Sequence, residues 1–158
     1  MPEIRSGLGF DVHPRDESRP LSLGGIGFPG EPGLAGHSDG DAVCHAVADA
    51  LLGAAALGDV GEHFPDGDPA TEGIPGLVLL ERAVGLLAAA GFEPSSIDVT
   101  VIAERPAVTP AKERMRGAIA TTLGVDPKRV SVKASRPEGL GLTGDGVGCL
   151  AIALVERS

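Results

Sequence analysis

With 158 residues, of which 42% are hydrophobic and 22% charged, the chain is long enough for one globular core and too short for two. We therefore expect a single domain over residues 1–158. Thirteen Lys and Arg against 22 Asp and Glu give a net charge of −9 at pH 7, which argues against a nucleic-acid partner held through its phosphates. Any phosphate-rich ligand must be held by local positive potential from metals, helix N-termini and a few basic side chains.

No apolar run is long enough for a membrane helix, and residues 1–10 lack the segments of a signal peptide. We therefore expect a cytoplasmic protein with no membrane partner. Cys44 and Cys149 form no Cys-x-x-Cys pair, so we expect two buried thiols rather than a disulfide or a thiolate zinc cluster. Because Trp and Tyr are absent and only four Phe occur, the core must consist of Ala, Val, Leu and Ile.

The N-terminal half predicts strands followed by a helix. Residues 5–12 have a strand pattern, and residues 21–23 and 26–28 predict a hairpin around Gly24-Gly25. Residues 29–36, with two Pro and three Gly, predict a loop. A Ser-x-x-Asp signal at Ser38 and Asp41, similar to a capping box, precedes apolar residues at helical spacing up to residue 58.

The C-terminal half alternates helices and strands after a long loop over residues 59–76. The remaining predicted elements are helices over residues 77–90 and 110–123 and strands over residues 98–103, 130–134 and 148–156. Because strands and helices are interleaved without regular parallel crossovers, the best fold class is α+β, a sheet with helices on one face. The other face of such a sheet needs a partner.

Asp11, His13 and His45 form the first candidate site. Residues two apart on a strand share a face, so Asp11 and His13 can converge on one point. A lone Asp-x-His is more often a surface or turn feature, and a lone His in an apolar helix is usually satisfied by ordinary hydrogen bonds. Asp41, His45 and Asp49, however, form a polar stripe on a helix whose flanks carry no charge. One carboxylate and two imidazoles leave tetrahedral zinc an open position.

Three further segments carry candidate ligand contacts. Free N–H groups at the helix start, with His37 and Ser38, can receive a phosphate. Asp59 and Asp66 can accept hydrogen bonds from ligand hydroxyls and Gly61 allows close backbone approach, although Asp and Gly are also ordinary turn residues. In a strand-to-loop boundary at residues 132–144, Ser135 and Arg136 suit a phosphate and Glu138 suits a cation such as magnesium.

Five segments together resemble one enzyme family. They are Gly-Phe-Asp-Val-His at residues 9–13, His-Ser-Asp-Gly-Asp at 37–41, residues 49–59, Phe-Pro-Asp at 64–66 and Leu-Gly-Leu-Thr-Gly at 140–144. The chain resembles, from Gly7 to its end, the 2-C-methyl-D-erythritol 2,4-cyclodiphosphate synthases of non-mevalonate isoprenoid biosynthesis. The resemblance implies a homotrimer of ferredoxin-like α+β subunits, each with a mixed four-stranded sheet facing the threefold axis and a small N-terminal hairpin. Three active sites would lie at the interfaces.

The resemblance also implies roles for individual residues. Zn²⁺ would be held by Asp11, His13 and His45, and Mg²⁺ or Mn²⁺ by Glu138 with the substrate phosphates. His37 would stabilise the transferring phosphate. The remaining substrate contacts would be Ser38, Asp59, Gly61, Asp66, Ala103, Ala107, Thr109, Ala134, Ser135 and Leu142. The loop from Ala103 to Thr109, with Ala134 and Ser135, would form a cytidine pocket contributed across the interface.

The chain departs from the family pattern at three places. The family commonly has Thr-Thr-Thr at the positions of Ser135-Arg136-Pro137, and the middle Thr is its second transition-state stabiliser. Arg136 at that position could act as a stronger charged donor or could obstruct the site. Ala107 or a neighbour stands where a Lys is common in the cytidine loop. Asp145 replaces the Arg of a frequent Thr-Gly-Arg-Gly-Glu-Gly, so we expect no isoprenoid diphosphate in the central trimer cavity.

The implied activity is that of a phosphorus–oxygen lyase. It converts 4-diphosphocytidyl-2-C-methyl-D-erythritol 2-phosphate to 2-C-methyl-D-erythritol 2,4-cyclodiphosphate and CMP. Two alternatives remain open. A zinc hydrolase would use the open metal position for water and would need a base beside it, for which Glu62 is the nearest candidate in sequence. A trimeric relative could bind the nucleotide while the Arg136-Pro137 loop impairs catalysis.

Overall fold

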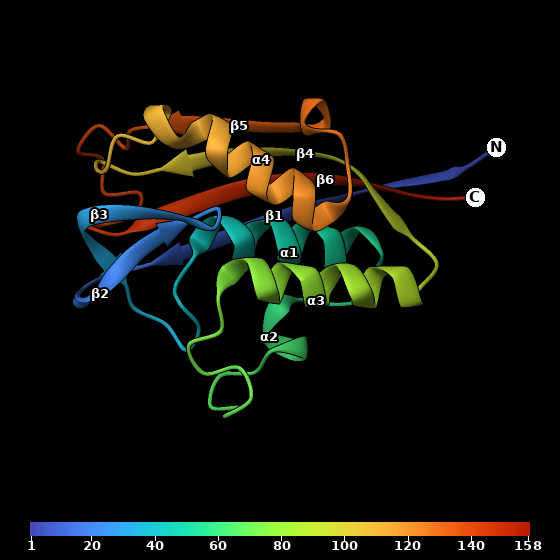
Figure 1. Cartoon of the computed structure of the whole chain (residues 1–158), viewed down its shortest axis with the longest axis horizontal. Helices are drawn as coiled ribbons and strands as arrows, with labels where there is room; N and C mark the ends of the chain where they lie inside the picture. Colours follow the sequence, from blue (N-terminus) through green and yellow to red (C-terminus); the bar gives the residue numbers. More distant parts are fainter.

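The computed structural model describes all 158 residues and contains a sheet, a separate hairpin and a set of helices (Figure 1). The strands are β1 (Glu3–His13), β2 (Arg15–Leu23), β3 (Ile26–Leu34), β4 (Glu93–Ile102), β5 (Val130–Ser135) and β6 (Val147–Arg157). The α-helices are α1 (Ala42–Ala54), α2 (Val60–His63), α3 (Gly76–Ala89) and α4 (Lys112–Leu123). Short 3₁₀ turns, η1 (Thr109–Ala111) and η2 (Pro127–Arg129), precede α4 and β5.

The main sheet is mixed. Its strand order is β1-β6-β4-β5; β6 pairs antiparallel with β1 and β4, whereas β4 and β5 pair in parallel through the α4 crossover. The register pairs Glu3 with Arg157, so both chain ends lie at one end of the sheet (Figure 1). The prediction of an α+β chain with a mixed four-stranded sheet is confirmed.

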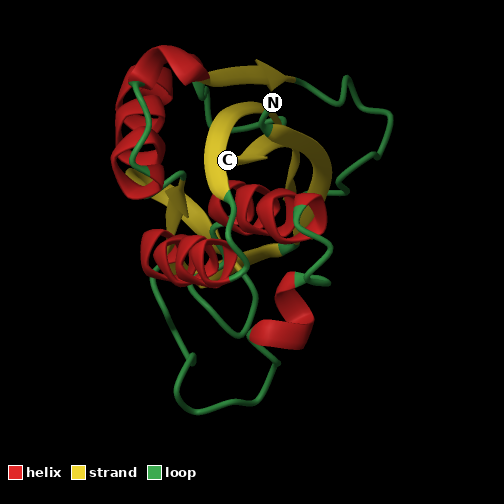
Figure 2. Cartoon of the chain, turned by 90° about the vertical axis from the view of Figure 1, so that its right-hand side faces the viewer, coloured by secondary structure: helices red, strands yellow, loops and turns green.

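The helices gather on one side of this sheet (Figure 2). Helix α1 packs on β1 and β6, α3 packs on α1, and α4 packs on β5. One cluster of 35 buried residues fills the space between these layers, and most of them are Ala, Val, Leu and Ile. Cys44 and Cys149 are both buried and free. The expected core composition and the expected buried thiols are therefore confirmed.

Two glycines of β1 set the distance between the sheet and α1. A Cβ on Gly7 would lie 2.0 Å from the carbonyl oxygen of Ala50, and one on Gly9 would lie 1.9 Å from that of Ala46. Only glycine leaves room for this approach of two backbones. Because residues 7, 9, 11 and 13 share one face of β1, the same approach places α1 against the end of the strand that carries Asp11 and His13.

The start of α1 differs from the predicted capping box. Asp41 is the N-cap, and its side chain accepts from the backbone N–H groups of Val43 and Cys44. The same carboxylate accepts from Gly24 and Gly25 in the hairpin turn, at 2.8 Å each. The expectation that the N–H groups of this helix start are free for a phosphate is therefore wrong for Val43 and Cys44. The side chain of Asp41 also points to the hairpin, so Asp41 does not belong to the predicted polar stripe with His45.

The predicted loop over residues 29–36 was also wrong, because β3 runs on to Leu34. In the hairpin register Pro32 faces Pro20. Each strand of a two-stranded ribbon has one free edge, so a proline that lacks an N–H can be accommodated there. The turn itself is as predicted, with φ of 59° at Gly24 and 76° at Gly25. Smaller differences are the start of β4 at Glu93, the end of α1 at Ala54 and the presence of α2 inside the long loop.

The sheet face opposite the helices is apolar and exposed. Alternate residues of β1 and β6 point outward, and the exposed large hydrophobic residues on them are Ile4, Leu8, Phe10, Val12, Leu150, Ile152 and Leu154. This confirms that one face of the sheet lacks a covering layer within the chain. Among the helices, none has both the length and the apolar character needed to cross a membrane.

We predict that Gly9→Ala destabilises the fold, because its Cβ would overlap the backbone of α1 at Ala46. The expected loss is about 1–3 kcal/mol of unfolding free energy, as for an overpacked core. Gly85→Ala is the matched control, because nothing lies within 4 Å of its Cβ and replacing a helical glycine stabilises by about 0.5–1 kcal/mol. Urea denaturation measures both. An unchanged midpoint for Gly9→Ala would contradict the packing argument.

Candidate active site

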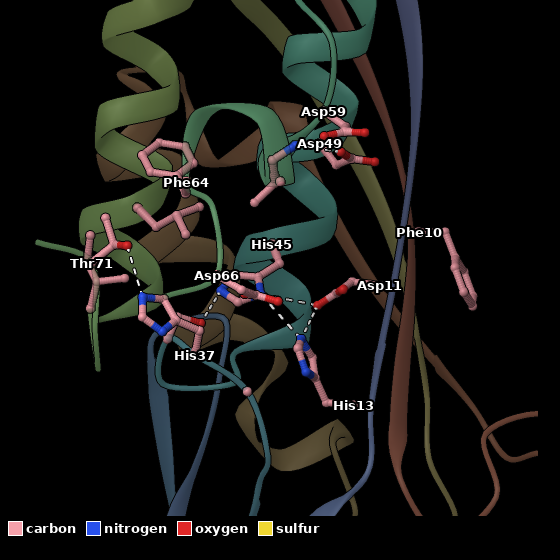
Figure 3. A pocket seen from close by; sticks show the side chains of 16 residues that line it. Phe10, Asp11, His13, His37, His45, Asp49, Asp59, Phe64, Asp66 and Thr71 are labelled. Atoms are coloured by element: carbon pink, nitrogen blue, oxygen red, sulfur yellow. Dashed lines mark hydrogen bonds and ion pairs between the residues drawn. The ribbon is translucent and has the colours of Figure 1, made fainter. Parts of the chain in front are cut away.

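The structure brings Asp11, His13 and His45 together at the end of β1. The Asp11 Oδ2 atom lies 2.6 Å from His13 Nε2 and 3.2 Å from His45 Nδ1, and the two ring nitrogens are 3.4 Å apart. Figure 3 shows the three side chains pointing toward one another. A ligand atom from each residue lies within 4.8 Å of the others. The predicted convergence of the strand residues with the helix residue is confirmed.

The chemistry of this cluster fits a divalent cation. Asp11 Oδ2 is buried and makes no hydrogen bond of acceptable geometry, and a buried polar atom without a partner is costly. A cation facing the carboxylate and two imidazole nitrogens would satisfy that atom and take a donor set typical of zinc. The three residues can therefore hold a metal ion.

The electrostatics of the cluster favour a negative carboxylate. Burial alone would raise the pKa of Asp11, but the adjacent rings of His13 and His45 outweigh it and lower the pKa. Burial would likewise lower the pKa of His13, but the adjacent carboxylate of Asp11 outweighs it and raises the pKa. Each member thus supports the charged form of its neighbour. A metal ion that binds here competes with protonation of His13.

The cluster lies in a cavity of about 500 Å³. His37, Ser38, Asp59, Gly61 and Asp66 line the same cavity, so the structure brings these predicted residues to the cluster. Asp59 is the N-cap of α2, where its Oδ1 accepts from Glu62 N at 2.9 Å. Its second oxygen remains for a ligand.

His37 holds the segment that follows α2. Its Nδ1 accepts from Gly67 N at 3.4 Å, and its Nε2 donates to Asp68 O at 2.8 Å and lies 3.2 Å from Thr71 Oγ1. Both ring nitrogens thus contact the loop that carries Asp66. His37 therefore anchors one wall of the cavity as well as lining it.

Sequence reasoning missed several residues that line this cavity. They lie on β1, between β3 and α1, on α1, around α2 and up to the start of α3: Phe10, Gly36, Asp49, Val60, Phe64, Thr71, Ile74 and Leu79. Asp49 had a signal, because it lies one helical turn after His45. Burial raises its pKa against the hydrogen bond from Val60 N, and in Figure 3 its carboxylate lies near that of Asp59.

A second cavity of about 140 Å³ holds the predicted cytidine residues. It lies where β4 and β5 end beside η1, and its predicted members are Ala103, Ala107, Thr109, Ala134, Ser135 and Arg136. Pro106 and Val108 of the predicted 103–109 loop line it as well, and so does Val101, which was not predicted. No residue lines both cavities. In a single chain the predicted site is therefore divided into two parts.

Glu138 and Leu142 line neither cavity. Both are exposed on the segment between β5 and β6, where the backbone N–H of Gly139 donates to Glu104 Oε1 at 2.8 Å. Glu138 has a φ of 54°, in the left-handed region that a non-glycine residue rarely adopts. Within one chain the structure does not bring Glu138 to the cluster of Asp11, His13 and His45.

Fold and site together define an α+β protein with a candidate mononuclear metal centre at the junction of a sheet and its covering helix. The model of the YgbB family matches residues 4–156. The 2-C-methyl-D-erythritol 2,4-cyclodiphosphate synthase of Trichlorobacter lovleyi is 49% identical over 96% of this chain and 97% of its own length. That of Symbiobacterium thermophilum is 51% identical over 94% of this chain and 96% of its own.

A solved structure of a 2-C-methyl-D-erythritol 2,4-cyclodiphosphate synthase in a CDP-bound form superposes with a TM-score of 0.87. It is 34% identical and the match covers 96% of this chain and 99% of the solved one. The chain belongs to the YgbB family, the family of the 2-C-methyl-D-erythritol 2,4-cyclodiphosphate synthases. The family predicted from the sequence segments is confirmed.

Proposed function

We propose that this chain converts 4-diphosphocytidyl-2-C-methyl-D-erythritol 2-phosphate to 2-C-methyl-D-erythritol 2,4-cyclodiphosphate and CMP, as a phosphorus–oxygen lyase. The observation that carries the proposal is the cluster of Asp11, His13 and His45 in a polar cavity of a chain that is about half identical to synthases of that name. An oxygen of the 2-phosphate attacks the β-phosphorus, the bond from that phosphorus to the bridging oxygen breaks, and CMP leaves with the oxygen.

The proposed metals are Zn²⁺ on Asp11, His13 and His45, and Mg²⁺ or Mn²⁺ on Glu138 with the substrate phosphates. When bound, these ions supply positive charge that polarises the phosphates and stabilises the leaving group. The unusual φ of Glu138 supports a ligand role, since strained backbone is concentrated at functional sites. A phosphate nucleophile is already ionised at neutral pH, so the chain needs no general base.

The protein residues of the first cavity mainly position the substrate. Asp59 and Asp66 accept from the hydroxyl groups of the methylerythritol, and Gly61 lets the chain approach it. His37 and Ser38 contact the phosphates. Holding the 2-phosphate beside the β-phosphorus lowers the barrier by removing the entropy cost of ring closure.

The second cavity is the proposed nucleotide pocket. Small side chains, Ala103, Ala107 and Ala134, line it together with the hydroxyl groups of Thr109 and Ser135. The exposed guanidinium of Arg136 lies at its edge, where it can donate two hydrogen bonds to a phosphate. We propose that Arg136 stabilises charge on the transferring phosphate in place of the hydroxyl group expected there.

We further propose a homotrimer of ferredoxin-like subunits with active sites between them. The nucleotide pocket and the metal cluster share no lining residue in one chain, so a second copy is needed to bring the two parts together. The apolar outer face of β1 and β6 provides the surface that such an assembly would bury. Leu142, on the exposed segment before β6, would contact substrate from there.

The hydrolase alternative lacks its required base. Glu62 is not among the residues that line the cavity of the cluster, and its carboxylate folds back over Gly58, where a Cβ would lie 2.5 Å from Glu62 Oε2. The synthase is therefore favoured over a hydrolase. Release of CMP from the substrate distinguishes the synthase from the second alternative, a protein that binds the nucleotide without catalysis.

We predict that His45→Ala removes zinc and lowers turnover by about 100-fold or more, because a ligand of the charge-stabilising ion is lost. Phosphorus NMR of the substrate with Mg²⁺ follows the cyclic diphosphate and CMP. His63→Gln is the control, because His63 contacts Leu57 O and lines neither cavity. Turnover by zinc-free His45→Ala protein would refute the assignment. Open-chain phosphate products from the wild type would indicate the hydrolase instead.

We predict that Arg136→Ala lowers kcat by about 10²–10³, the usual cost of removing one donor to developing charge, and that Arg136→Thr retains more activity. The control is Arg114→Ala, which removes an exposed arginine of α4. Steady-state release of CMP measures the effect. Faster turnover in Arg136→Ala than in the wild type would show that Arg136 obstructs the site.

We predict that Ile152→Asp disrupts the trimer, since it places a charge in the centre of the apolar outer face of the sheet. Val78→Asp is the control, because Val78 is a similarly exposed apolar residue on α3, away from that face. Analytical ultracentrifugation gives the oligomeric state. A trimeric Ile152→Asp protein, or a monomeric wild type, would contradict the proposed assembly.

A further inference from the structure

The segment formed by residues 35–38 contacts both histidines of the metal cluster from the side that faces away from it. His13 Nδ1 donates to the carbonyl oxygen of Ala35 over 2.7 Å, because a carbonyl can only accept. Nε2 is therefore the nitrogen of that ring that faces Asp11 and that is left to bind a cation once it carries no proton. Ser38 Oγ lies 2.8 Å from His45 Nε2, so Nδ1 is the nitrogen of His45 that faces the cluster.

These two contacts are shielded from water. Ser38 is 6% exposed and His45 is 8% exposed. A Cβ on Gly36 would lie 3.2 Å from Cε1 and Nδ1 of His13, so the segment packs directly against the ring. A hydroxyl group can donate or accept, and with Nδ1 of His45 on a cation, Ser38 Oγ must accept from Nε2–H.

Arg19, on β2, holds this segment in place. One terminal nitrogen of its guanidinium donates to the carbonyl oxygen of Gly36 at 2.8 Å, and the other donates to that of Ser38. The two carbonyls bracket His37. Arg19 makes no salt bridge with a carboxylate, so its hydrogen bonds serve the backbone of this segment. The segment's start is fixed separately, because Ala35 N donates to Pro14 O at 2.9 Å.

We propose that Arg19 is a positioning residue for the metal ion, acting through Ser38 on His45 and through the Ala35 carbonyl on His13. The inference rests on the proposed zinc site. Ligand histidines bind tightly when a partner on their second nitrogen fixes the tautomer and the ring orientation. Here one short segment supplies that partner for both rings, with its start held at Pro14 and the part from Gly36 to Ser38 held by Arg19. Ser38 thereby gains a role distinct from its proposed contact with substrate.

The test compares Zn²⁺ dissociation constants of the full-length protein, measured by competition with a chromophoric chelator. We expect Arg19→Met to weaken Zn²⁺ binding by about 10–100-fold, the usual effect of losing an outer partner of a metal ligand. The visible spectrum of the Co²⁺-substituted protein should shift as well. Arg116→Met is the matched control and should bind Zn²⁺ as the wild type does, because Arg116 also donates to a carbonyl, that of Pro127 at 2.7 Å, but lines neither site cavity.

Ser38→Ala tests the contact between Ser38 and His45 without removing a charge. It provides the test of the inference if Arg19→Met fails to fold. We expect it to weaken Zn²⁺ binding in the same range, and the double variant to lose less than the product of the two effects, since both act through His45. Folded Arg19→Met and Ser38→Ala proteins with wild-type Zn²⁺ affinity would overturn this inference and leave the proposed function intact. A wild-type protein that binds no Zn²⁺ would instead overturn the proposed function.

Discussion

The position of α1 depends on one buried carboxylate, that of Asp41. It is fully buried and accepts from four backbone N–H groups, two in the hairpin turn at Gly24 and Gly25 and two in the first turn of α1 at Val43 and Cys44. Burial raises the pKa of this carboxyl, so these hydrogen bonds must offset the cost of removing its charge from water. Each buried N–H left without a partner would cost about 1–3 kcal/mol. The hairpin and the helix are therefore positioned as one unit.

This constraint reaches the candidate metal centre because the other side of α1 rests on glycines. Gly7 and Gly9 let the helix backbone approach β1, while Asp41 fixes where the helix begins. His45 lies one turn after Asp41 and therefore comes to the end of β1, beside Asp11. A side chain at either glycine would move the helix away and separate His45 from Asp11 and His13. The close packing thus serves the geometry of the site as well as the stability of the core.

Sequence reasoning succeeded where the signal was local and failed where the partner was distant in the chain. The ligand set with His45 could be predicted, because strand and helix periodicities show which residues share a face. The extent of β3 could not, because Pro and Gly usually indicate a loop and only pairing with β2 overrides that preference. The role of Asp41 was misread as a capping box, since two of its four donors come from the hairpin. No local pattern identifies Arg19 or Thr71. The partners of Arg19 are backbone carbonyls and that of Thr71 is the ring of His37, all of them distant in the sequence.

The small N-terminal hairpin supports both parts of the divided site. Arg19 on β2 holds the segment beside the cluster of Asp11, His13 and His45. Arg15 on the same strand donates to the carbonyl oxygens of Pro32 in β3, Asp145 before β6 and Arg105 in the loop that lines the second cavity. Both arginines use their fixed, planar arrangement of donors to join backbone segments rather than to balance charge. Because His13 is followed almost directly by Arg15, one stretch of chain carries a member of the Asp11, His13 and His45 cluster and the support of the loop beside the second cavity. A shift of this strand would therefore disturb both.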